Sequence, residues 1–140
     1  MGLDQYAYEL GEKIPEGQPN DFRHGPYDYR AEIGCWRKHN RLQGWMEDLY
    51  REKGGTGVFN TDAEVELTGE DLDSLEKAVE NEDLPETGGF FFGADSYEWY
   101  DEEFKEGGRL TTYRDKDLRF ISDARKALNK GRSVVYTCWW

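Results

Sequence analysis

Six consecutive residues form the densest group of hydrogen-bond donors in the chain: Trp36-Arg37-Lys38-His39-Asn40-Arg41. They stand where a strand should turn into the first helix, and donors beside free backbone N–H groups suit a phosphate or a carboxylate. Alternatively, the two arginines pair with acidic residues and Trp36 is core, because Arg favours carboxylate partners either way. Asp4 and Tyr97 would belong to the same binding site only if the fold brings them close to these donors. The predicted ligand-binding residues are Arg37, Lys38, Asn40, Asp4, Trp36 and Tyr97.

Other chemistry is weakly supported by the sequence. Cys35 and His39 are four residues apart, so a thiolate activated by imidazole is conceivable, but a buried thiol beside a helix-entry histidine is the simpler interpretation. Carboxylates between Glu82 and Glu103 could form an acid/base pair or a cation site by proximity, yet a solvated acidic face explains them equally well. No phosphate-loop motif occurs and the two His and two Cys lack ligand spacing, so we predict no metal and no cofactor.

Composition indicates one folded domain over residues 1–140, with an irregular surface loop near 11–29 where prolines and glycines gather. Mean hydropathy is −0.97, but five Trp, nine Tyr and seven Phe supply apolar surface for a core. With no signal sequence and no long apolar run, we expect a cytoplasmic protein that does not enter membranes. Cys35 and Cys138 are then expected to be free thiols.

Charge is distributed unevenly along the chain. The net charge is −12, and fourteen acidic against two basic residues lie between Glu70 and Glu106. Between Arg109 and Arg132 there are eight basic and three acidic residues. Duplex nucleic acid is excluded as a partner, because binding it requires Lys and Arg to displace counterions from phosphates. The acidic segment also permits a DNA mimic that blocks a nucleic-acid-binding protein.

Residue periodicity predicts four strands and four helices. Residues 42, 45, 46, 49 and 50 are apolar at the spacing of one helical face, and Thr68 with Asp71, like Thr112 with Asp115, can cap helices. The aromatic run around Phe91 predicts a buried strand. The fold class expected is α+β, a small, mostly antiparallel sheet with about four helices packed on it. The strands are predicted near 2–9, 63–67, 88–93 and 133–140, and the helices near 38–53, 69–82, 96–105 and 113–130.

Four blocks together resemble a family of small proteins common in bacteriophages and prophages, and the resemblance spans the chain. Its members often bear the label phosphoglycerate kinase, which does not fit because that two-domain enzyme is about three times this length. The family usually has Tyr, Ala and an Ile-His pair where Cys35, His39, Leu42 and Gln43 stand here, which argues against imidazole-based catalysis. The blocks are Met1-Gly2-Leu3-Asp4, Trp36-Arg37-Lys38 with Asn40, Gly89-Phe90-Phe91-Phe92-Gly93, and a final aromatic strand ending in Trp.

The resemblance implies a phage-encoded accessory protein of the host cytoplasm. We expect it to bind a host protein or a small anionic, nucleotide-like ligand rather than to act by catalysis. The first alternative is a small-molecule enzyme whose pocket is formed by Arg37, Lys38, Asn40 and Asp4 with an acidic partner such as Asp95. The second alternative is the acidic DNA mimic. The sequence leaves the oligomeric state open.

Overall fold

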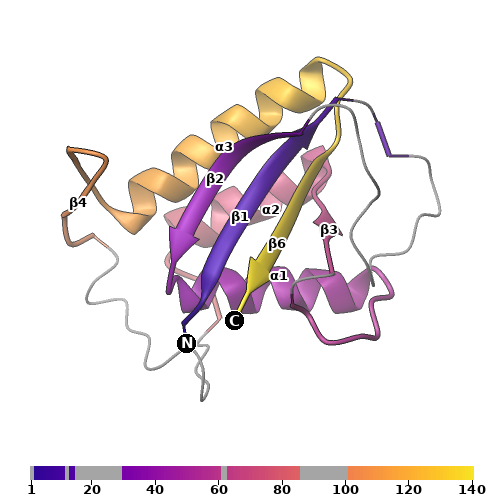
Figure 1. Cartoon of the computed structure of the whole chain (residues 1–140), viewed down its shortest axis with the longest axis horizontal. Helices are drawn as coiled ribbons and strands as arrows, with labels where there is room; N and C mark the ends of the chain where they lie inside the picture. The colour runs from indigo at the N-terminus through magenta and orange to yellow at the C-terminus, as the bar shows by residue number, and fades with distance from the viewer. Residues whose placement is uncertain (1, 12, 15–29, 61–62, 86–100) are drawn as a thin grey trace.

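A four-stranded antiparallel sheet and three helices make up the described part of the chain, which in this computed structural model is residues 2–11, 13–14, 30–60, 63–85 and 101–140. The strand order is β2-β1-β6-β3, and the helices lie together behind the sheet in Figure 1. The sheet is formed by β1 (Asp4–Leu10), β2 (Arg30–Arg37), β3 (Val65–Glu66) and β6 (Val134–Trp139). The helices are α1 (Asn40–Glu52), α2 (Gly69–Glu80) and α3 (Tyr113–Asn129), and a separate hairpin pairs β4 (Phe104–Glu106) with β5 (Arg109–Thr111).

Strand β1 lies between β2 and β6 and sets the register of both. Asp4 is opposite Arg37 on one side and Trp139 on the other. Because side chains alternate along a strand, Gln5 and Ala7 face the helices while Asp4 and Tyr6 face away. The same alternation separates two sequence neighbours, because Trp36 is buried and Arg37 is exposed.

Aromatic side chains fill the space between the sheet and the helices. Trp36 meets Phe120 of α3 edge to face at 5.2 Å between ring centroids, and Tyr136 at 6.2 Å. Tyr50 of α1 stacks on Phe59 at 4.8 Å, and Phe59 continues to Tyr136 at 6.0 Å. These rings form a continuous series through a core whose other buried residues are mostly aliphatic.

The α+β class with an antiparallel sheet is confirmed, while the predicted helix count is one too high. The structure describes three helices, and the predicted helix at 96–105 is the one that differs. Its described end is a turn at Asp101 followed by β4 from Phe104. In β4, the Phe104 ring packs on Tyr113 at 5.2 Å, so the tertiary contact overrides the helical spacing.

Several predictions fall outside the described residues: most of the loop near 11–29, the strand near 88–93 with Phe91, and Tyr97. The two predicted caps are confirmed. Thr68 and Asp71 form a complete capping box, and the Thr112 side chain accepts from the Asp115 backbone. Among the helices of the described ranges, none has both the length and the apolar character needed to cross a bilayer.

Replacing Gly34 by alanine should destabilise the protein, because a Cβ there would lie 2.5 Å from the Trp36 ring and 3.1 Å from Phe120. Overpacking of this kind costs about 1–3 kcal/mol of unfolding free energy. Denaturant titration measures the loss. Gly69→Ala is the matched control, since a Cβ there meets open space. Equal midpoints for Gly34→Ala and the parent would contradict the packing of Trp36.

Candidate functional site

A buried carboxylate joins three elements of the fold. Asp117 of α3 is fully buried and accepts from Trp36 Nε1 at 2.9 Å and from His39 Nε2 at 2.8 Å. Trp36 belongs to β2 and His39 precedes α1 directly. The carboxylate therefore fixes the strand, the helix start and α3 relative to one another.

The Gln5 side chain holds the backbone of His39. Gln5 Oε1 accepts from His39 N and Gln5 Nε2 donates to His39 O, both at 2.9 Å. Gln5 Nε2 also donates to the Tyr136 hydroxyl at 2.9 Å, which donates to Gln43 Oε1 at 2.6 Å. Burial raises the pKa of Tyr136 well above its usual value, so that hydroxyl stays protonated. Since the His39 side chain makes no cap bond at α1, Gln5 secures this helix start from β1.

Two further backbone groups of the turn between β2 and α1 are hydrogen-bonded. The Tyr113 hydroxyl donates to Arg37 O at 2.7 Å, and Lys38 N donates to Leu3 O at 2.9 Å. Lys38 has a φ of 55°, a left-handed conformation that costs a non-glycine residue about 1–2 kcal/mol. Strained conformations persist where their surroundings over-determine them, and they gather at functional sites.

The face of the sheet away from the helices is buried around Leu10 and Val135 and open at the other end of the strands. On this open face, three side chains form a row across neighbouring strands: Arg37 on β2, Asp4 on β1 and Trp139 on β6. Arg37 Nε donates to Asp4 Oδ1 at 3.2 Å, and the Arg37 side chain is 83% exposed. Trp139 is 64% exposed. Lys38 follows directly after the row and is exposed.

A cavity of about 400 Å³ lies at this end of the sheet, lined by Gly2, Asp4, Trp139 and Trp140. Trp140 is fixed, because its backbone N donates to Asn60 Oδ1 at 3.1 Å and its ring Nε1 to Phe59 O at 2.9 Å. We call Arg37, Lys38, Asp4, Trp139 and Trp140 the sheet-end site. It combines one carboxylate and two indole rings that line the cavity with two cations beside them, of which Arg37 is bonded to Asp4.

The structure brings together three of the predicted ligand-binding residues and separates two others. Arg37, Lys38 and Asp4 belong to the sheet-end site, whereas Trp36 and Asn40 are buried, each 1% exposed. Tyr97 lies outside the described residues. The sequence analysis missed Trp139 and Trp140. Strand alternation in β6 did not mark them, because Val135 and Thr137, which lie on the same face of the strand as Trp139, are buried as well.

The alternative cysteine–histidine pair is not formed. Cys35 lies on β2 opposite Tyr6 of the open face, whereas His39 is buried against Asp117. Both cysteines are free. Burial, followed by the charge of Glu32, raises the pKa of Cys35, so its thiol holds its proton above the usual range. Burial raises the pKa of Cys138 to about 12.

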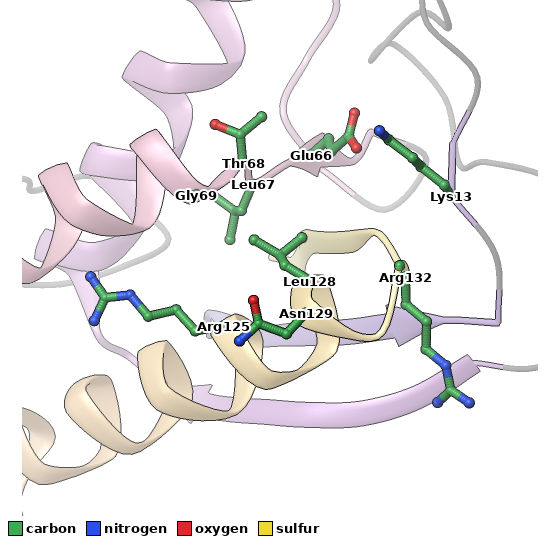
Figure 2. Close-up of a pocket in the computed structure, with 10 residues that line it drawn as sticks. Lys13, Glu66, Leu67, Thr68, Gly69, Arg125, Leu128, Asn129 and Arg132 are labelled. Atoms are coloured by element: carbon green, nitrogen blue, oxygen red, sulfur yellow. The ribbon is translucent and has the colours of Figure 1, made fainter.

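A second cavity, of about 470 Å³, lies between the start of α2 and the end of α3 (Figure 2). Leu67 and Leu128 point toward each other across it, while the Arg125 and Arg132 guanidinium groups point away to either side. Arg125 donates to Asp73 and Glu76, and Arg132 donates to Glu9. These arginines therefore link α3 to α2 and the turn after α3 to β1. Within the described ranges, no three His, Cys, Asp or Glu side chains are grouped so that they could hold a metal ion.

No protein-family model, curated protein or solved structure matches this chain. The resemblance to phage and prophage proteins therefore stays a prediction. The geometry of the two cavities is then the basis for a function. The sheet-end site has more charge available to a ligand than the second cavity, where Arg125 and Arg132 are bonded to carboxylates.

Replacing Asp117 by alanine should cost about 3–5 kcal/mol of unfolding free energy, because it removes the buried acceptor of both Trp36 and His39. Asp117→Asn should cost less, about 1–2 kcal/mol, since its amide oxygen can still accept the hydrogen bond from Trp36 Nε1. Denaturant unfolding compares the two variants. A loss below about 1 kcal/mol in Asp117→Ala would show that the carboxylate does not join these elements.

Thiol reactivity should be slow and should increase with pH. Because the pKa of Cys35 is raised, its thiolate fraction at pH 8 is smaller than that of free cysteine, and Cys138 is buried with a pKa of about 12. A thiol reagent should therefore label Cys35 more slowly than free cysteine, and Cys35→Ser should leave only the still slower reaction of Cys138. Faster labelling of Cys35 than of free cysteine at pH 7 would indicate an activated nucleophile.

Proposed function

We propose that this protein binds a small anionic, nucleotide-like ligand at the sheet-end site and does not catalyse a reaction there. The observation that carries the proposal is the row of Arg37, Asp4 and Trp139 on adjacent strands beside a cavity of about 400 Å³. Concave sites with a few converging polar groups suit small ligands better than flat protein surfaces.

The cations at the site are available to a ligand. The Asp4 bond uses Nε of Arg37, and among the described residues the two terminal amino groups donate to no other side chain. Arg presents planar donors that match a phosphate or carboxylate, and Lys38 adds a mobile charge. In a chain of net charge −12, two cations in this position favour an anion locally.

Rigidity of the surroundings supports binding. The backbone on both sides of Lys38 is bonded to Leu3, Gln5 and Tyr113. Trp140 is held by Asn60 and Phe59. A ligand then orders few protein groups, and preorganisation of this kind raises affinity.

The titratable groups near the site favour binding over catalysis. His39 and Asp117 are 3% and 0% exposed and are bonded to each other, so they have little access to a ligand. The raised pKa of Cys35 keeps its thiol protonated and weakly nucleophilic. Arg37 and Lys38 supply donors that bind and orient anions.

Arg37→Ala should weaken ligand binding without unfolding the protein. A charge-assisted hydrogen bond contributes about 1.5–3 kcal/mol, so the Kd of a nucleotide should rise about 10- to 150-fold. The exposed pair with Asp4 should contribute under about 1 kcal/mol to stability. Calorimetric titration against a nucleotide panel and thermal unfolding measure the two effects.

Arg109→Ala is the matched control, because it removes the same charge from the exposed strand β5. It should bind like the parent, and binding to the parent should weaken as salt is added. If no nucleotide or phosphate binds the parent and Arg37→Ala unfolds it, Arg37 has a structural role and the proposal is wrong.

A further inference from the structure

We infer, building on the proposed function, that the ligand is a ribonucleoside phosphate whose base, ribose and phosphate are recognised by Trp139, Asp4 and Arg37 in that order. The three residues share one register position on β6, β1 and β2. Neighbouring strands are about 4.8 Å apart, so the row extends about 10 Å. A ribonucleoside monophosphate is linear in the same sense, with the sugar between the base and the anion.

The carboxylate in the middle of the row discriminates between anions. A bare phosphate beside Arg37 would also lie near Asp4, and like charges repel. Asp4 therefore disfavours the binding of an inorganic anion. It favours a ligand that has hydroxyl donors next to its anionic group. Arg37 occupies Oδ1 at 3.2 Å, and a carboxylate accepts several further bonds.

Ribose supplies those donors as two adjacent hydroxyls. An acidic side chain accepts the ribose 2′-hydroxyl in dinucleotide-binding folds for the same chemical reason. Deoxyribose lacks that hydroxyl and would leave Asp4 with fewer donors. Asp4 is thus the residue that determines specificity between the two sugars.

Trp139 and Trp140 provide the place for the base. Both line the cavity that Asp4 also lines, and Trp139 exposes 64% of its surface at the end of the row. Any of the bases can stack on an indole ring, because each base has a π face. The geometry therefore specifies a ribonucleotide without specifying which base it carries.

Calorimetric titration of four compounds tests the assignment: adenosine 5′-monophosphate (AMP), its 2′-deoxy form (dAMP), ribose 5-phosphate and inorganic phosphate. The parent should bind AMP about 5- to 10-fold tighter than dAMP, the contribution of one hydrogen bond. The parent should bind AMP about 5- to 150-fold tighter than ribose 5-phosphate, because only AMP has a base that can stack on an indole ring. Trp139→Ala should remove most of the difference in affinity between AMP and ribose 5-phosphate. It should keep the difference between AMP and dAMP.

Asp4→Asn should reduce the preference for AMP over dAMP, because an amide oxygen accepts a weaker hydrogen bond than a carboxylate, while phosphate binding stays equal or becomes tighter because a like charge is gone. Glu32→Gln is the matched control, since it removes one carboxylate from an exposed position of β2, and it should keep the preference. Thermal unfolding confirms that each variant is folded.

The outcomes separate the two hypotheses. If the parent binds phosphate, AMP and dAMP with equal affinity, the assignment of Asp4 and Trp139 is overturned while the proposed function stands. If Glu32→Gln reduces the sugar preference as much as Asp4→Asn does, the preference reflects overall charge and the assignment also fails. If none of the four compounds binds the folded parent, the proposed function fails together with this inference.

Discussion

The buried carboxylate of Asp117 is the constraint on which the other contacts depend. A charge removed from water is costly unless it is paired and hydrogen-bonded, and here both oxygens are used, one by Trp36 and one by His39. These partners come from the end of β2 and the start of α1, so α3 can pack in only one position. The edge-to-face contact of Trp36 with Phe120 and the clamp of Gln5 on the His39 backbone both require that position.

Alternation along the strands extends this constraint to the surface. Trp36 is anchored in the core, so its neighbour Arg37 must face the open side, and Gln5 places Asp4 beside it in the same way. Each exposed side chain of the row is thus positioned by an interior residue next to it in sequence. Stability comes from the inner set, and the outer set remains available to a ligand.

The features that could be predicted from sequence are those determined locally. The apolar stripe of α1, the threonine caps and the β-branched strand β6 each have their signal within a few residues. For β2 the sequence indicated only that a strand should end before the first helix and not where it begins, because a bulge at Ile33 interrupts its alternation and β1 sets its pairing. Trp36 and Asn40 were grouped with Arg37 because they are close in sequence, but the strand places Trp36 on the other face. Asp117 gave no signal, since its partners are 78 and 81 residues away.

The central position of β1 has a consequence for biosynthesis. Residues 4–10 are synthesised before residues 134–139, which form one of their two neighbouring strands. Until that segment has been translated, β1 has one free edge and Gln5 lacks the Tyr136 hydroxyl. The sheet therefore closes after synthesis of this segment, and products of interrupted translation would lack both the core and the Trp139 side of the hollow.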